Sequence, residues 1–358
     1  MNTQKSIRTA LVLAGLLAGL GTGLHAQQTF GTTIYFDWTH FVSDNGPKTS
    51  APPATPSFKN DYFAFRRAYF TYENKINDNL KFRFRYDADN TANLTSVDSA
   101  FKTKKDDKLR PFVKHLYFEY SNLIPRSVLR VGMTETLTFK PAEERWGYRS
   151  VAKTLLDSYK DITGVEIDAT SADIGVSLTG SLNKYLRYGF MVSNGSHYSH
   201  AETDTWKKLM AQATLVPVAG FSLVGYMDFE KQAADKNAST YKIDGLFEMV
   251  KNLVIGAEYF VYRNDLYLTG TNRFDVSGFS LFGRYTVTTD KLALFARYDA
   301  HEPNSRVDKD KTSLVIAGLD WAPWHTSIKF QPNIWIQSYQ DSAKKNDVIF
   351  NMTFFMSF

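Results

Sequence analysis

The chain has 358 residues, no cysteine and a formal net charge of +5 at pH 7. This near balance of charge, without a basic tail, excludes nucleic acid as an expected partner. The absence of cysteine excludes a disulfide framework and a cysteine-ligated metal site.

The first 26 residues are typical of a cleaved export signal. Lys5 and Arg8 give it a positive start, the apolar core runs from Ala10 to Leu20, and a Gly-rich stretch ends at Ala26. The core is too short to span a bilayer as a helix, so we expect cleavage after Ala26. Removal of residues 1–26 leaves 40 basic against 37 acidic residues, and residues 27–358 are expected to form a single domain.

Alternation of polar and apolar side chains dominates the rest of the chain. In residues 80–89, LKFRFRYDAD, the apolar side chains share one face of a strand and the charged side chains share the other. The same pattern predicts sixteen strands, near residues 29–42, 61–75, 79–90, 112–121, 127–134, 173–181, 185–194, 205–216, 220–231, 240–250, 253–264, 274–287, 291–301, 311–322, 325–340 and 347–358.

The predicted connections alternate between short and long. Short turns are expected at 76–78, 182–184, 217–219, 251–252, 288–290 and 323–324, and longer loops at 43–60, 91–111, 134–172, 195–204, 232–239, 265–273, 302–310 and 341–346. Bacterial transmembrane barrels have this rhythm, and closure leaves no backbone group without a partner in lipid. The sequence therefore predicts an all-β fold, a transmembrane antiparallel β-barrel of about sixteen strands, wide enough for a water-filled channel.

The last strand gives independent support. Phe350, Met352, Phe354, Met356 and the final Phe358 share one face. This stripe resembles the C-terminal strand that outer-membrane barrels present to the barrel assembly machinery. We therefore expect the bacterial outer membrane as the location, and membrane lipid and that machinery as partners.

The longest break in the pattern, residues 134–172, is the third long loop. Residues 141–146 predict a helical turn, residues 150–159 a weak helix, and residues 164–169 (GVEIDA) alternate like a strand. Loops of this length are often functional, and we expect this one to fold inward and narrow the barrel. Its candidate pore-facing cations are Arg145, Arg149 and Lys153, and the last two could share a helix face. The alternative is a solvated outer loop, and its five cations against seven anions do not decide selectivity.

Three stretches, residues 65–89, 113–144 and 173–195, resemble the phosphate-selective porin O and P family. The resemblance implies a sixteen-stranded, trimeric porin that favours anions such as phosphate. It also implies a lumen lined by basic side chains, here Arg67, Lys81, Arg83, Arg85 and Arg130. Acidic residues on the same strand faces leave two alternatives open: a non-selective diffusion porin for neutral solutes too, and cations that merely pair with neighbours such as Asp87 and Asp89.

Other classes of function are less well supported by the sequence. His197 and His200, in NGSHYSH, have a spacing that hints at a metal, but no acidic or cysteine partner completes the motif nearby. No nucleophile–histidine motif is present. We therefore expect no enzyme activity, no catalytic residue, no metal and no cofactor, with a barrel enzyme or an adhesive barrel as the competing classes.

Overall fold

A computed structural model describes residues 27–43, 61–89, 94–97, 103–106, 110–165, 167–198, 200–233, 236–265 and 274–358. The expected signal peptide, residues 1–26, lies outside the described residues. So does almost all of the first expected long loop, residues 43–60.

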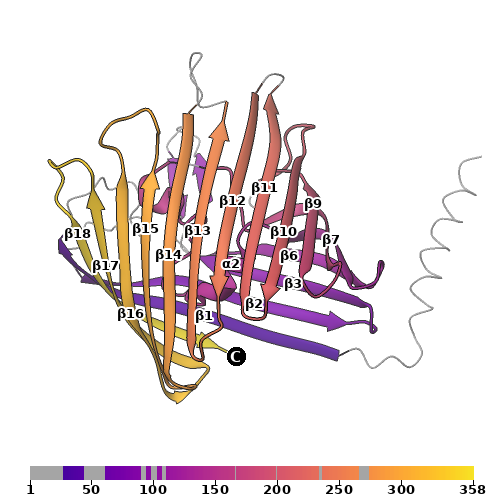
Figure 1. The fold of residues 1–358 in the computed structure, drawn as a ribbon, viewed down its shortest axis with the longest axis horizontal. Helices are drawn as coiled ribbons and strands as arrows, with labels where there is room; N and C mark the ends of the chain where they lie inside the picture. The colour runs from indigo at the N-terminus through magenta and orange to yellow at the C-terminus, as the bar shows by residue number, and fades with distance from the viewer. Residues whose placement is uncertain are drawn as a thin grey trace, which may run out of the picture.

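Within the described residues, the chain folds into sixteen strands that close on one another (Figure 1). In barrel sequence order these strands are β1 (Gln27–Ser43), β2 (Asp61–Lys75), β3 (Leu80–Asp89), β6 (Arg110–Ser121), β7 (Ser127–Glu135), β8 (Ala172–Ser181), β9 (Leu186–Ser193), β10 (Lys208–Val218), β11 (Phe221–Ala233), β12 (Lys236–Phe247), β13 (Leu253–Asn264), β14 (Phe274–Thr288), β15 (Leu292–Glu302), β16 (Thr312–His325), β17 (Ile328–Tyr339) and β18 (Asp347–Ser357). The predicted fold class and each of the sixteen expected strands are confirmed.

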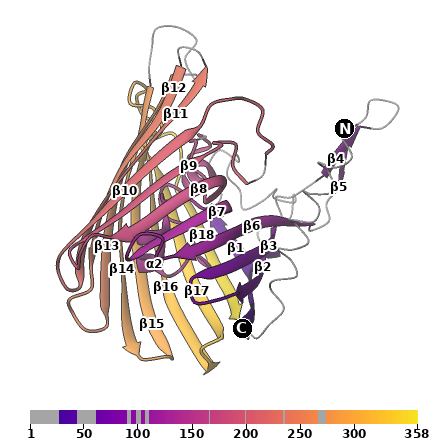
Figure 2. The ribbon, with the colours of Figure 1, turned by 90° about the vertical axis from the view of Figure 1, so that its right-hand side faces the viewer.

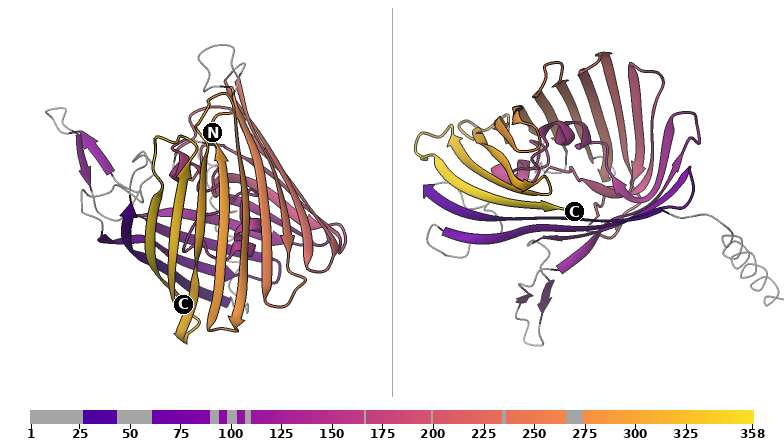
Figure 3. Two further views of the ribbon diagram at one scale, coloured as in Figure 1. Left: turned by 60° about the vertical axis from the view of Figure 1, so that its left-hand side comes forward. Right: turned by 90° about the horizontal axis from the view of Figure 1, so that it is seen from below.

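The barrel closes by pairing its first strand with its last. β1 pairs with β18 in antiparallel register from Thr33 opposite Ser357 to Ser43 opposite Val348, and with β2 on its other edge. Every barrel strand therefore has two neighbours, which satisfies its backbone N–H and C=O groups without solvent. The view along the barrel in Figure 3 shows the resulting ring.

The two faces of the wall differ as the alternation predicts. On β15, Leu294 and Tyr298 are each 43% exposed on the outside, whereas Arg297 and Asp299 between and beside them are buried inside. An apolar outer face with polar side chains within is the pattern of a barrel that spans lipid. No helix of the described residues is long and apolar enough to cross a membrane.

The connections keep the long-short rhythm with three corrections. The turn expected at 217–219 lies mostly inside β10, which continues to Val218. The segment 232–239, expected as a loop, is mostly strand, because β11 and β12 extend to Ala233 and Lys236 and meet in register there. The turn expected at 323–324 lies inside β16, which continues to His325 before β17 begins at Ile328. Within the second long loop, β4 (Leu94–Val97) and β5 (Thr103–Asp106) form a separate two-stranded sheet that the sequence pattern did not predict (Figure 2).

The third long loop, residues 136–171, lies inside the barrel, and we call it the inner loop (Figure 3). It contains two short helices, α2 (Lys140–Trp146) and α3 (Tyr159–Thr163). The helical turn predicted at 141–146 is confirmed, whereas the helix predicted over 150–159 is wrong, since helix begins only at Tyr159. The possible strand at 164–169 is also wrong, because none of its described residues pairs with a strand.

Candidate functional site

The inner loop covers an apolar region of the barrel's inside wall. Trp146 is fully buried, and its ring lies edge-on to Phe282 of β14 and Phe295 of β15, with 5.8 Å between ring centroids in both pairs. The indole N–H of Trp146 donates a hydrogen bond of 2.9 Å to the carbonyl of Ala152. The loop is therefore packed against the wall and does not lie free in the lumen.

A second cluster fixes the returning half of the inner loop. Leu155, Leu156 and Tyr159 are buried against Phe260 of β13 and its neighbours, with the Tyr159 and Phe260 rings 5.3 Å apart. The Tyr159 hydroxyl also donates to the carbonyl of Ser277 at 3.0 Å. Full burial of each large apolar side chain contributes about 1.5–3 kcal/mol, so the two clusters together hold the loop firmly.

Buried cations on the wall add polar anchors to the loop. Lys242 of β12 donates to the carbonyl of Thr138 at 3.3 Å and is itself balanced by Asp244 at 2.8 Å and Glu258 at 3.2 Å. Arg297 of β15 donates to the carbonyl of Lys153 while pairing with Asp299. Because each cation is paired on the wall side, its remaining donors can bind the loop backbone.

Lys208 of β10 provides the corresponding anchor near the end of the loop. Its ammonium lies 3.1 Å from the carboxylate of Asp168 in the inner loop and 3.4 Å from Glu230 on the wall. Burial opposes ionisation of Asp168, but the adjacent Lys208 and the hydrogen bond from His197 outweigh it and hold the pKa of this carboxyl below its ordinary value. Asp168 is therefore charged at neutral pH and keeps the loop attached.

A bulge in β2 places two consecutive arginines inside the barrel. Tyr35 pairs with Arg67 but Phe36 pairs with Phe65, so Arg66 is the extra residue and breaks the alternation. Arg66 forms an ion pair of 2.6 Å with Asp37 and donates to the loop carbonyls of Val151, at 2.9 Å, and Ser150. Strict alternation assigns Arg66 to the outside, so the sequence analysis missed this contact.

A second bulge, in β6, does the same for Lys114 and His115. Arg85 pairs with His115 and Tyr86 with Val113, which leaves Lys114 as the extra residue; both side chains are buried. The Lys114 ammonium lies 3.3 Å from the ring centre of Tyr198, a cation–π contact with the fourth long loop. In both bulges two adjacent polar residues interrupt the alternation, and this is the sequence signal that could have revealed them.

The five cations predicted to line the pore lie on β2, β3 and β7, away from the apolar clusters, and we call them the basic strip. Four of them are ion-paired: Arg67 with Asp87 (3.4 Å) and Asp89 (2.8 Å), Lys81 with Glu119 (3.4 Å), Arg83 with Glu73 (3.2 Å) and Glu135 (2.9 Å), and Arg130 with Glu119 (2.9 Å) and Glu135 (3.1 Å). Within the described residues, Arg85 alone of the five has no carboxylate within 4.0 Å; it donates to the Thr71 hydroxyl at 2.8 Å.

The three cations predicted on the loop are also paired. Arg145 lies 2.7 Å from Glu248, Arg149 contacts Glu143 and Asp157, and Lys153 lies 2.9 Å from Asp161. Arg149 and Lys153 do not share a helix face, because residues 149–153 lie between the two helices. Burial opposes ionisation of Asp157, yet the guanidinium of Arg149 holds the pKa of this carboxyl below its ordinary value.

The histidine pair of the fourth long loop has an acidic partner that the local sequence does not reveal. The Nε2 atom of His197 lies 2.6 Å from Asp168, a residue of the inner loop. The described part of the chain contains no group of three histidine, aspartate or glutamate side chains placed to hold a metal ion. The contact therefore links two loops at the mouth of the barrel.

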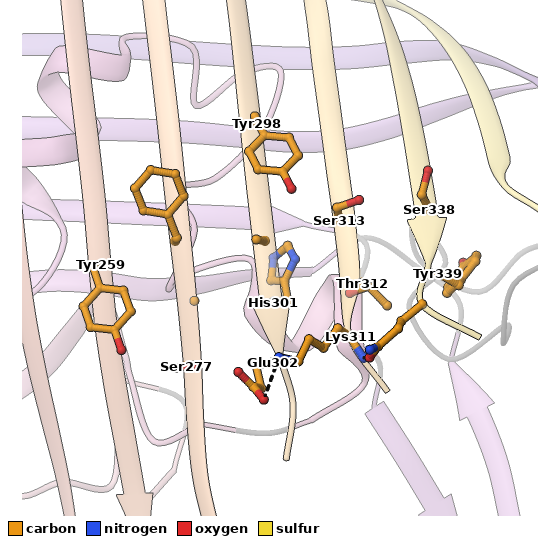
Figure 4. A pocket seen from close by; sticks show the side chains of 14 residues that line it. Tyr259, Ser277, Tyr298, His301, Glu302, Lys311, Thr312, Ser313, Ser338 and Tyr339 are labelled. Carbon is orange, nitrogen blue, oxygen red and sulfur yellow. Dashed lines mark hydrogen bonds and ion pairs between the residues drawn. The ribbon is translucent and has the colours of Figure 1, made fainter. Parts of the chain in front are cut away.

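A separate hollow of about 490 Å³ crosses the long-loop ends of β13 to β17 (Figure 4). Tyr259 and Tyr298, which line it, point outward from the wall, and Lys311 pairs with Glu302 at its rim at 3.1 Å. Its outward-facing tyrosines place part of this hollow on the outer surface, whereas His301, also in its lining, is buried on the inside of the wall.

Comparison with known proteins defines the class of fold. The chain is similar to OmpT of Vibrio cholerae (11% identity, TM-score 0.61, covering 94% of this chain and 99% of that one) and to the outer membrane channel DcaP of Acinetobacter baumannii (13%, 0.62, 93% and 97%). It is also similar to an anion-selective porin from Comamonas acidovorans (8%, 0.66, 93% and 100%). No family model and no curated protein matches the sequence. The fold is therefore that of the outer-membrane β-barrel porins.

Proposed function

We propose that this protein is an outer-membrane porin through which small hydrophilic solutes diffuse passively, with a modest preference for anions. The closed barrel, its polar inside wall and the docked inner loop support a narrowed aqueous channel. Arg85 is the observation that carries the anion preference, because its charge faces no carboxylate at ion-pair distance within the described residues. Such a charge raises the local concentration of anions.

Dedicated phosphate selectivity is the finer alternative, and the geometry of the basic strip argues against it. A phosphate needs arginine donors that are free to bind its oxygens. Arg67, Arg83 and Arg130 already donate to carboxylates, so phosphate would have to displace those partners. We therefore propose general diffusion with weak anion preference over a phosphate-specific channel.

We also propose that the porin is a homotrimer and that Phe358 is read by the barrel assembly machinery. The outer face around β1 and β18 is rich in aromatic rings, with Phe36 stacked on Phe354 at 4.7 Å and Phe330 against Phe354 at 5.6 Å. Such a surface suits a protein partner as well as lipid. Light scattering of the purified protein in detergent tests whether it is a trimer. Removal of Phe358, with the yield of assembled barrel as the readout, tests whether this residue is recognised by the assembly machinery.

The channel is tested by recording currents across a planar lipid bilayer under a KCl gradient. We expect a reversal potential of the sign set by chloride preference, and the Arg85→Gln variant should lower the ratio of chloride to potassium permeability by about two- to fivefold. Lys251→Gln, an equal change of charge at an exposed short turn, is the control and should have little effect.

Three results would count against the proposal. Cation preference in the unaltered protein would contradict the proposed anion preference. Equal effects of Arg85→Gln and Lys251→Gln would remove Arg85 as its origin. Well-folded protein without any stepwise conductance would favour the competing class, a barrel enzyme, over a channel.

A further inference from the structure

A cleft of about 430 Å³ lies inside the barrel between the first part of the inner loop and the wall formed by β7 to β12. Its lining includes inward-facing side chains near the short-turn ends of these strands, such as Arg187 of β9 and Thr214 of β10, and residues 136–145 of the loop. It is distinct from the basic strip, with which it shares only Arg130.

Positive charge predominates in this cleft. Its lining contains five cations, Arg126, Arg130, Lys140, Arg145 and Arg187, but only two acids, Glu135 and Glu144. The acids and their neighbours neutralise Arg130, Lys140 and Arg145, whose charged groups lie 2.7–3.9 Å from a carboxylate. Within the described residues, Arg126 and Arg187 have no carboxylate within 4.0 Å, and both are exposed.

The backbone places these two arginines on either side of one residue, Ser181. Arg187 is the register partner of Ser181 across the β8–β9 pair. The N–H of Ser181 in turn donates to the carbonyl of Arg126 at 3.2 Å. The two arginines therefore lie on either side of Ser181, roughly 10 Å apart by two strand spacings, and both line the same end of the cleft.

The other side of the cleft is apolar. Leu137 of the inner loop, Val224 of β11 and Leu246 of β12 line it, and all three are nearly fully buried. Gly189 leaves room for this packing, because a Cβ at this position would lie 3.2 Å from a methyl group of Leu137. These side chains expose little surface to the cleft, so an organic anion would gain over an inorganic one chiefly by moving its own apolar face out of water.

We propose that the cleft is a binding site for a small organic carboxylate with an apolar body, placed on the path of solutes that leave the inner loop toward the short-turn end. The carboxylate accepts hydrogen bonds from Arg126 and Arg187, and the apolar body contacts Leu137, Val224 and Leu246. The hydroxyls of Thr179, Thr214 and Ser222 line the remaining wall. This proposal names a class of substrate for the channel, and it rests on the channel function proposed above.

The test uses benzoate as the probe and acetate as the charge-matched anion without an apolar ring. In single-channel recordings of the full protein, we expect benzoate to interrupt the current at about tenfold lower concentration than acetate, from its additional buried apolar surface. The Arg126→Gln/Arg187→Gln variant should weaken benzoate block at least about tenfold, whereas Lys251→Gln should not. Val224→Asn should reduce the advantage of benzoate over acetate.

Equal block by benzoate and acetate, or benzoate block that survives the double arginine substitution, would overturn the proposal. Isothermal titration of benzoate into the purified barrel separates this outcome from failure of the channel function. Benzoate binding that depends on both arginines in a protein without conductance would retain the site and reject the channel. Conductance without such binding would retain the channel and reject the site.

Discussion

Trp146 is the largest side chain that fixes the inner loop to the wall, and its replacement by alanine should release the loop while leaving the barrel closed. Burial of the ring, its two edge-on contacts with Phe282 and Phe295 and its hydrogen bond to Ala152 are all lost. Each aromatic contact contributes about 0.5–1.5 kcal/mol beyond its buried area and the hydrogen bond about 1 kcal/mol. With the cavity left behind, the total is about 3–5 kcal/mol.

This loss falls on docking of the loop, because Trp146 takes no part in the pairing of the strands. The equilibrium between docked and released loop should therefore shift by about two to three and a half orders of magnitude. Single-channel recording should show higher conductance and greater current noise, and limited proteolysis should cleave within residues 136–171. Trp324→Ala is the matched control, because Trp324 is 76% exposed on the outside of β16. Unchanged conductance, noise and protease resistance in Trp146→Ala would refute the account of how the loop is held.

Three further predictions concern pH, buried charge and strand packing. Arg149 lowers the folded-state pKa of Asp157. Their contact therefore stabilises the docked inner loop at any pH above the ordinary aspartate pKa of about 3.9. This stabilisation is lost only as the pH falls through the lower folded-state pKa. Current noise should therefore stay low at pH 4 and rise in more acidic solution, and a rise already at pH 6 would contradict this. Lys242→Met leaves Asp244 and Glu258 buried without a cation and should lower the free energy of unfolding in urea by about 3–5 kcal/mol. Neutralising both acids in the same variant should restore most of this free energy. A variant that is not rescued in this way would contradict the explanation by buried charge. Gly132 has a φ of 125°, and Gly132→Ala places a Cβ 2.3 Å from the carbonyl oxygen of Leu116. The yield of folded, heat-modifiable barrel on gels should therefore fall sharply. Gly225→Ala is the control and should fold normally, because its added Cβ meets nothing within 4 Å.

The barrel was predictable because lipid forces a simple pattern on its strands. A strand with water on one side and lipid on the other must alternate, and residues 80–89 do so without exception. The segment 232–239 was mistaken for a loop because composition alone does not show how far a hairpin extends beyond the membrane. Its strands continue to Ala233 and Lys236, where they still pair with each other.

The interior was less predictable, because its features depend on contacts between distant parts of the chain. Bulges shift the side of the wall that a residue faces, and strict alternation therefore misplaced Arg66. The docking surface of the inner loop did leave a signal. In residues 292–298, LALFARY, Phe295 is apolar on the face opposite Leu294, and apolar residues on both faces indicate a strand that is covered from inside. The pairing of His197 with Asp168 had no such signal, because the two residues come from different loops.

The inner loop begins and ends at paired positions of two neighbouring strands, β7 and β8. Glu135 is the register partner of Ala172, and the N–H of Thr136 donates to the carbonyl of Ser171 at 3.2 Å. The two strands therefore form a complete hairpin whether or not the intervening residues fold inward. Lengthening, shortening or exchanging this insertion would alter the calibre of the passage while leaving closure of the cylinder intact. The limit on such changes is the apolar lining around Phe282 and Phe295, which any replacement segment has to shield from water.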